Sequence, residues 1–202
     1  MNRREPNRLF TIGHSNHAIE DFIALLEQHS VDCIADVRSA PYSRHNPQFN
    51  RETLRDSLKA HDIGYVWLGR ELGARAEDEG CYIDGRVSFS KLAASPLFLA
   101  GIERLIEGSR KFTVAMMCAE REPLNCHRTI LVSRHLITRG ISIEHILGDG
   151  GLEPHRLTLD RLIELVGLEK NDLFRSADES IEEAYRLRER EVAHRADRHQ
   201  PN

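Results

Sequence analysis

The sequence predicts an α/β fold: a doubly wound, mostly parallel five-stranded sheet with helices on both faces, followed by a C-terminal helical tail. Two observations support this prediction. Short apolar segments rich in β-branched residues alternate five times with segments of helical periodicity. Such alternation is typical of a parallel sheet in a Rossmann-like domain, with right-handed crossovers. The composition is globular, because 40% of the 202 residues are hydrophobic and 30% are charged.

The first two strands end at polar residues. Residues 8–13 form an apolar run that stops at His14, and residues 31–37 form a β-branched run that stops at Arg38. Between them, apolar residues at i, i+3, i+4 and i+7 over residues 19–26 predict an amphipathic helix. Parallel strands end at the same edge of a sheet, so these polar side chains are expected to share that edge.

The middle of the chain holds a third strand and a long loop. A short helix is expected at residues 54–58, and the third strand at residues 65–68. Four glycines and dense charge over residues 69–87 then predict an irregular excursion. Loops of this length are usually functional or mobile.

The second half continues the alternation. A helix opens at Pro96, and the fourth strand at residues 112–117 is apolar throughout, as a central parallel strand should be. A helix over residues 126–139 and a fifth strand over residues 141–147 follow.

We expect one domain over residues 1–157 and a helical C-terminal extension over residues 158–202. The last helix, at residues 180–194, is mostly Glu and Arg with few apolar positions. Such a narrow apolar stripe predicts a peripheral or partly disordered extension.

The strand order decides where a ligand binds. In doubly wound sheets, ligands bind beyond the carboxyl ends of the strands, at the point where the order reverses. If the order is 3-2-1-4-5, that point lies between strands one and four. His14 and Cys118 would then face each other across a crevice, with Asp36 and Arg38 beside them.

Cys118, Cys126, His127 and Arg128 form the densest reactive cluster in the sequence. A helix that starts at Cys126 would favour a thiolate there, because free backbone N–H groups stabilise anions. Arg128 and those N–H groups could equally hold a phosphate. In the alternative interpretation, both cysteines are small buried hydrophobic residues.

His14, Asp36 and Arg38 also have two interpretations each. His14 follows a glycine that lets the backbone approach a ligand, or it caps the next helix. Asp36 and Arg38 contact a ligand, or they form a structural ion pair. The loop after Arg38 is locally basic and includes Ser43, which suits phosphate binding as well as an ordinary solvated loop.

We expect no cofactor, and zinc is disfavoured. Cys118, Cys126, His127 and His14 are suitable zinc ligands, but their spacing matches no common zinc module. On a regular helix His127 would also point away from a metal bound by Cys126. The sequence contains no glycine-rich dinucleotide or P-loop motif and no nucleophile elbow.

Three motifs in order, TIGHS, ADVRSAPYSR and CAEREPLNCHR, resemble a widespread bacterial and archaeal family known as domain of unknown function 488. The resemblance covers about residues 8–155 and implies a single α/β domain, without implying a reaction. Its signature positions fall on Thr11, Gly13, His14, Ser15, Asp36, Arg38, Pro41, Ser43, Cys118, Glu120, Pro123, Cys126, His127 and Arg128. Cys33 and Cys81 lie outside these motifs.

These observations favour an enzyme that acts on an anionic, phosphate-bearing substrate, related to a nucleotide or a nucleic acid, such as a Cys/His-dependent hydrolase or transferase. The expected catalytic residues are Cys118, Cys126, His14 and His127, and the expected substrate contacts are Asp36, Arg38, Ser43, Glu120 and Arg128. The alternatives are a non-catalytic nucleic-acid or ligand-binding module and a cysteine-based redox or metal sensor. The net charge of -4 gives no general attraction to nucleic acid. We expect a cytoplasmic protein without a membrane partner.

Overall fold

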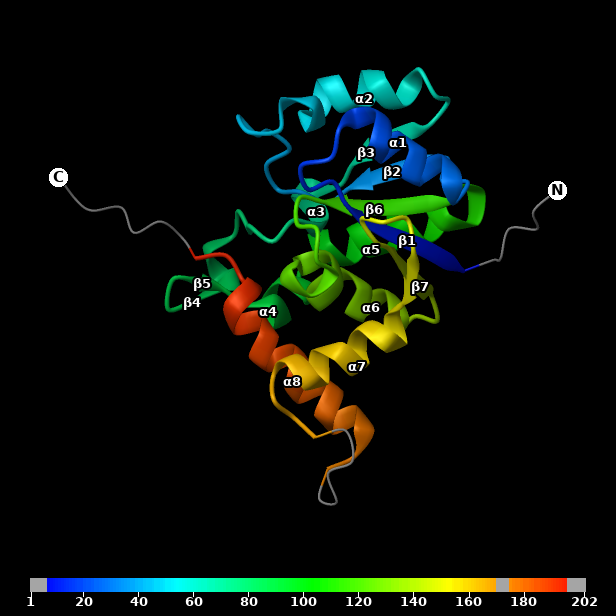
Figure 1. The fold of residues 1–202 in the computed structure, drawn as a ribbon. Helices are drawn as coiled ribbons and strands as arrows, with labels where there is room; N and C mark the ends of the chain where they lie inside the picture. The colour runs from blue at the N-terminus through cyan, green and yellow to red at the C-terminus, as the bar shows by residue number, and fades with distance from the viewer. Residues whose placement is uncertain (1–6, 170–174, 196–202) are drawn as a thin grey trace.

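A six-stranded sheet organises the fold, which we describe from a computed structural model over residues 7–169 and 175–195 (Figure 1). Its order is β3-β2-β6-β1-β7-β8. Five strands are parallel, and β8 pairs antiparallel with β7. The strands are β1 (Arg8–Gly13), β2 (Cys33–Asp36), β3 (Gly64–Trp67), β6 (Val114–Cys118), β7 (Ser142–Ile146) and β8 (Leu152–Pro154).

The α/β class is confirmed, while the strand count of five and the order 3-2-1-4-5 are wrong. The missed strand, β8, has three residues and follows a tight turn in which Gly150 has φ +86°. So short a segment shows no alternation in sequence. The fourth predicted strand, β6, lies between β1 and β2 instead of beyond β1. On one side of this central strand Gly13 pairs with Cys118, and on the other side Asp36 pairs with Met117.

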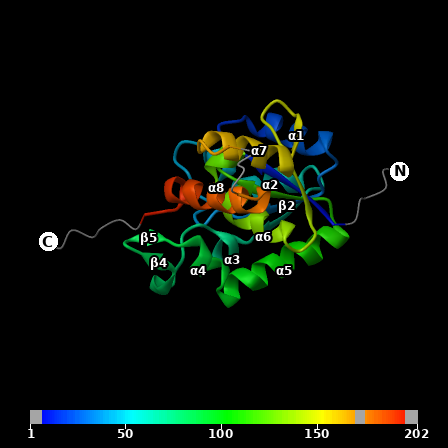
Figure 2. The same cartoon turned by 90° about the horizontal axis from the view of Figure 1, so that it is seen from below.

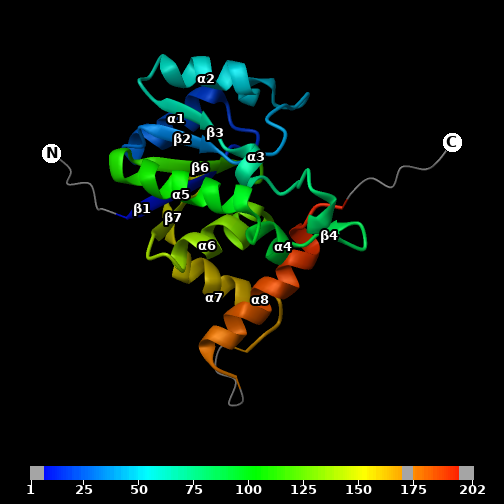
Figure 3. The same ribbon diagram turned by 180° about the vertical axis from the view of Figure 1, so that it is seen from behind.

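Helices cover both faces of the sheet (Figure 3). On one face, α1 (Ile19–Gln28) and α2 (Arg51–Lys59) pack on Phe10, Ile12 and Met117. The other face, with Leu9, Met116 and Cys118, packs against the second group of helices. That group comprises α3 (Gly69–Leu72), α4 (Phe89–Ala93), α5 (Pro96–Lys111), α6 (Arg134–Ile137), α7 (His155–Leu165) and α8 (Ala177–Val192). Alternation along β6 therefore points Cys118 toward α8 and away from α1.

The segment after β6 differs from the predicted helix over residues 126–139. Pro123–Asn125 form a 3₁₀ turn, Cys126 is extended with φ -136° and ψ 142°, a π-helix covers Arg128–Ser133, and α6 follows. Wide turns of this kind occur often at functional sites. The extended residue at 126 lets the chain change direction between the turn and the helix.

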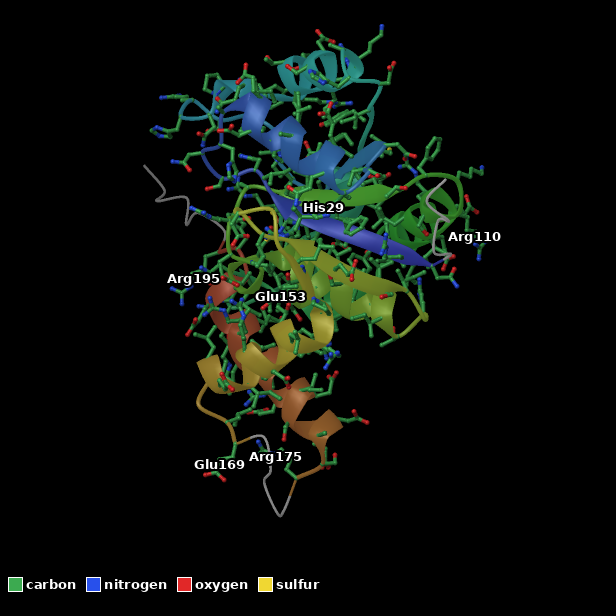
Figure 4. The ribbon with its side chains drawn as sticks, turned by 45° about the vertical axis from the view of Figure 1, so that its right-hand side comes forward. His29, Arg110, Glu153, Glu169, Arg175 and Arg195 are labelled. Atoms are coloured by element: carbon green, nitrogen blue, oxygen red, sulfur yellow. The ribbon has the colours of Figure 1, made fainter. Side chains whose placement is uncertain are left out.

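The C-terminal extension packs more closely than its narrow apolar stripe predicts. Seen from below in Figure 2, α7 and α8 lie across the lower face of the molecule. Leu162 and Tyr185 belong to the larger core cluster. The proposed boundary after residue 157 falls inside α7, which begins at His155. Glu153 of β8, labelled in Figure 4, accepts a hydrogen bond from Thr158 and also ties α7 to the sheet.

A row of four buried polar side chains links the sheet to α8. Thr11 Oγ1 lies 2.6 Å from His145 Nδ1, His145 Nε2 lies 2.9 Å from His155 Nδ1, and His155 Nε2 lies 2.9 Å from the Tyr185 hydroxyl. Burial keeps the pKa of His155 at about 4 and that of His145 well below its usual range. Both histidines are therefore neutral near pH 7, and the row satisfies their ring nitrogens without any charge.

Last, two short strands, β4 (Tyr82–Ile83) and β5 (Arg86–Val87), form a hairpin within the predicted excursion over residues 69–87. A bridge pairs Arg86 with Arg195, which Figure 4 labels beyond the end of α8. The excursion is thus ordered partly by contact with the C-terminal extension.

Candidate active site

A cavity of about 260 Å³ opens where β2 and β6 end. Residues from four distant parts of the sequence line it: Arg38, Ser39, Ala40, Ala74, Arg75, Cys118, Ala119, Glu120, Asn125, Cys126, His127, Val192 and His194. Five of these are predicted site residues, namely Arg38, Cys118, Glu120, Cys126 and His127. The end of a parallel sheet therefore brings them together, although the strand order differs from the expected one.

The two sulfur atoms of Cys118 and Cys126 lie 2.7 Å apart. His127 Nδ1 lies 3.6 Å from the first sulfur and 3.7 Å from the second. Cys118 also donates its thiol proton to Glu120 Oε2 at 2.8 Å. These four residues form one hydrogen-bonded group, which we call the thiol cluster.

A backbone carbonyl fixes the tautomer of His127. Nε2 lies 3.0 Å from the Val37 oxygen, and because a carbonyl only accepts, Nε2 carries a proton. In the neutral ring Nδ1 then has a free lone pair directed at both thiols. Burial alone would lower the pKa of His127, but Cys118 and Glu120 raise it above its usual value. His127 is thus placed to take a proton from a thiol.

The two thiols differ in their surroundings. Burial and the adjacent Cys126 raise the pKa of Cys118 well above its usual value, so Cys118 keeps its proton. Cys126 instead accepts the backbone N–H of Arg128 at 3.4 Å, at the start of the π-helix. An N–H directed at sulfur stabilises a thiolate. Cys126 is therefore the better nucleophile of the pair.

Glu120 adds a negative charge at the cavity. Burial would raise its pKa, but hydrogen bonds from the two thiols lower it below the usual value. An ionised Glu120 next to His127 favours the protonated imidazole, which in turn favours a thiolate. The thiol cluster therefore contains both a proton acceptor, His127, and a negative charge, on Glu120, that stabilises the imidazolium formed when a thiol proton moves to His127.

Arg128 holds the loop between the cysteines and does not line the cavity. It is fully buried, and it donates to the carbonyl oxygens of Glu120 at 2.6 Å and Arg121 at 3.1 Å. The same loop crosses β1 so closely that a Cβ on Gly13 would lie 1.9 Å from the Glu120 oxygen. Sequence reasoning placed Arg128 on the substrate, whereas the structure places it behind the thiol cluster.

Asp36, Arg38 and His14 form a second group, which we call the ion-pair network. Arg38 donates to Asp36 through Nε at 2.9 Å and through Nη2 at 2.6 Å, and it is only 6% exposed. It also donates to the Phe49 carbonyl and to His14 Nε2 at 3.1 Å. This is the structural ion pair that the sequence left open, although Arg38 also reaches the cavity wall.

The contacts of His14 leave it without a free ring nitrogen. Nδ1 donates to the Ser15 carbonyl at 2.9 Å, so Nε2 is the acceptor for Arg38. The ring stacks on Phe49 with centroids 4.3 Å apart. Burial and the charge of Arg38 lower the pKa of His14 to about 4. The structure therefore gives His14 the position of a support for Arg38 and keeps it off the lining of the cavity.

Ser43 and the arginines that follow it in the basic loop also lie off the cavity lining, which includes only Ser39 and Ala40 from the start of this loop. Ser43 Oγ accepts the backbone N–H groups of His45 and Asn46, which shapes the loop. Arg51 stacks over Trp67 at 4.7 Å. Phe49 and Arg51 are thus engaged by the protein itself, which leaves fewer groups of this loop for a nucleic acid.

Arg75 is a lining residue that sequence reasoning missed. Its backbone N–H donates to Ser39 Oγ at 3.0 Å, which fixes the loop after α3 against the cavity. Within residues 7–169 and 175–195 its guanidinium forms no ion pair. The only sequence signal was the long charged excursion over residues 69–87, which predicts a functional loop but no particular residue.

The thiol cluster also resembles part of a metal site. The ligand atoms of Cys118, Cys126 and His127 lie within 4.8 Å of one another. The Val37 carbonyl on Nε2 is the outer contact that metal-bound histidines usually have. The expectation that His127 points away from Cys126 is wrong, because Cys126 is extended and not helical. Two sulfurs bound to one tetrahedral zinc lie about 3.8 Å apart, whereas these lie 2.7 Å apart. The sulfur atoms are therefore closer together than a tetrahedral zinc ion requires, and binding the metal would need them to move apart.

The fold and the site define an α/β protein with a thiol–imidazole group at the carboxyl edge of its sheet. The family profile described as "Domain of unknown function DUF488" matches residues 18–135. The chain belongs to this family. No curated protein and no solved structure matches the chain. In the described part of the chain, no helix combines the length and apolar character needed to cross a membrane.

Proposed function

We propose that this protein is an enzyme that forms a covalent intermediate on Cys126 with a small anionic substrate. The observation that carries the proposal is the orientation of His127, whose Nδ1 faces both thiols because its Nε2 donates to Val37. A thiol with an oriented base at hydrogen-bonding distance is the arrangement that nucleophilic catalysis requires. In this role Cys126 attacks, and His127 accepts and returns the proton.

The charges at the cavity support an anionic substrate. Arg75 contributes a cation that forms no ion pair within the described residues, whereas Arg38 on the same wall is paired with Asp36 and the Glu120 carboxylate accepts a hydrogen bond from Cys118. A guanidinium binds carboxylate or phosphate through two parallel hydrogen bonds. Pockets that enclose a drug-sized ligand have about 300–1,000 Å³. At about 260 Å³ the cavity suits a small anion or one end of a larger molecule. This size favours a small molecule over a nucleotide or nucleic acid.

The test compares an anionic and a neutral alkylating agent. For each cysteine we compare the rate of alkylation by iodoacetate, which is anionic, with the rate by iodoacetamide, which is neutral. The ratio of these two rates should be higher for Cys126 than for Cys33 or Cys81. Burial raises the pKa values of Cys33 and Cys81, so these two serve as internal controls. Arg75→Gln should reduce the iodoacetate preference at Cys126 at least about fivefold, since one nearby opposite charge contributes about 1 kcal/mol. Arg44→Gln, an exposed arginine off the cavity lining, is the matched control. Equal preference at all three cysteines would refute the proposal.

A metal-binding sensor is the second candidate, and the three grouped ligand atoms favour it. In that case Cys118, Cys126 and His127 would hold a soft divalent ion such as zinc. We expect less than one zinc per chain in the purified protein, measured by elemental analysis. One zinc per chain that is lost in Cys118→Ser and Cys126→Ser but kept in Cys33→Ser would favour the sensor.

A further inference from the structure

Two thiols in direct contact can do more than one thiol with a base. The sulfur atoms of Cys118 and Cys126 are 2.7 Å apart, whereas a disulfide bond needs about 2.05 Å. They need to approach by roughly 0.7 Å to form a bond. The loop between them is fixed by Arg128 at the Glu120 and Arg121 carbonyls, so their contact is built into the fold.

We propose that Cys126 and Cys118 act as a dithiol that reduces the disulfide bond of a small anionic molecule. The proposal rests on the proposed function, because it uses the same cavity and the same nucleophile. It assigns to Cys118 the role of resolving residue and names the substrate class as an anionic organic disulfide.

The chemistry balances in two steps. In the first, Cys126 gives its proton to His127 and attacks one sulfur of the substrate. The substrate S–S bond breaks, a mixed disulfide forms, and the leaving thiolate takes the proton from His127. In the second, Cys118 gives its proton to His127 and attacks the Cys126 sulfur, and the second substrate thiolate leaves with that proton. The substrate gains two electrons, and the protein dithiol becomes a disulfide. An external thiol restores the dithiol by the reverse exchange.

The positions of the groups favour this course over hydrolysis. A group on Cys126 has the Cys118 sulfur as its nearest nucleophile, while water reaches it only through the cavity. Intramolecular attack by a held neighbour has a large entropic advantage over attack from solution. Glu120, which accepts the Cys118 thiol proton at 2.8 Å, and His127 both lie where that proton must go.

The experiment uses the full-length protein, reduced and treated with chelator, and glutathione disulfide as the anionic probe. In the wild type, peptide mapping should show a Cys118–Cys126 disulfide with release of two glutathione thiols. The variant Cys118→Ser should stop at one glutathionyl group on Cys126. In the variant Cys126→Ser, Cys118 should react with glutathione disulfide no faster than Cys33 does. Cys33→Ser is the matched control and should behave like the wild type.

Cystamine, a cationic disulfide, separates this inference from the proposed function. We expect it to react at least about tenfold more slowly than glutathione disulfide, because the Arg75 guanidinium repels a cation. Equal rates with both probes would contradict the anionic site but keep the dithiol. A preserved iodoacetate preference without any Cys118–Cys126 disulfide would contradict the dithiol but keep the proposed function. If the serine variants do not fold, the wild-type peptide map alone still decides whether the disulfide forms.

Discussion

His14 and His127 lie at the same edge of the sheet, and both are buried, yet their contacts give them opposite behaviour. In the ion-pair network, the Arg38 guanidinium donates to His14, and the pKa of His14 falls to about 4. In the thiol cluster, thiols and a carboxylate surround His127, and its pKa rises. Burial lowers the pKa of both rings, so the neighbouring groups make the difference. A buried histidine can take up a proton only where its neighbours are acids.

The largest expected effect is on the ion-pair network. Among the described residues, Arg38→Ala leaves the buried Asp36 carboxylate with Tyr65 as its remaining side-chain partner. Removing one member of a buried ion pair costs about 3–5 kcal/mol of unfolding free energy. Urea unfolding at pH 7 measures this loss.

Arg75→Ala is the control for that comparison. It removes an exposed arginine from the same cavity, and it should change the unfolding free energy by no more than about 0.5 kcal/mol. A loss below about 1 kcal/mol for Arg38→Ala would mean that Arg38 serves a ligand and not the fold.

The second prediction concerns acid. Because His14 has a pKa of about 4 when folded and about 6.5 when unfolded, the unfolded chain binds more protons between these values. His14 therefore stabilises the fold fully above pH 6.5 and loses this contribution as the pH falls toward 4. Between pH 7 and pH 5, His14 should account for a loss of about 2 kcal/mol of unfolding free energy. His155, with a pKa of about 4, acts in the same direction.

The variant His14→Gln tests that share, because the glutamine oxygen can still accept from Arg38 but does not titrate. Urea unfolding at pH 7 and pH 5 should show a smaller difference for this variant than for the wild type. An unchanged difference would mean that His14 does not contribute to the acid sensitivity.

The smallest expected effect is on His127, where burial opposes the raised pKa. The sign is opposite: His127 stabilises the fold below the unfolded pKa of about 6.5, and this contribution is lost as the pH rises through the folded value. An NMR titration should show a midpoint above 6.5 for His127 and no change in His14 until near pH 4. Cys118→Ala should lower the His127 midpoint. A His127 midpoint below that of His14 would reverse the comparison.

The sequence predicts the class of fold and the residues of the thiol cluster because both depend on local patterns. Apolar runs give five of the strands, and Cys118, Cys126 and His127 follow one strand end. It does not predict the strand order, since the position of β6 depends on contacts between residues about 100 positions apart. The same limit applies to Arg75, whose place at the cavity depends on how a long loop packs.

The different positions of Arg38 and Arg128 show a second limit. Both arginines lie near reactive residues in the sequence, and sequence alone cannot tell that Arg38 pairs with Asp36 at the cavity wall while Arg128 holds backbone carbonyls. Arg128 is buried because the turn at Pro123–Asn125 brings the Glu120 and Arg121 carbonyls back over it. The same turn is followed directly by Cys126 in an extended conformation, and this conformation brings His127 to the two sulfur atoms.

The position of β6 between β1 and β2 also affects how the chain folds while it is being made. In the finished sheet β1 pairs with β6 and β7, both of which come about 100 residues or more after it. At about 5–20 residues per second, the ribosome needs roughly 5–20 s to reach β6. Until then Leu9, Phe10 and Ile12, which are buried in the finished sheet, belong to a strand whose partners have not been synthesised. The partners β2 and β3 lie only about 30 residues apart and are both synthesised early, whereas β1 cannot pair within the sheet until β6 has been made.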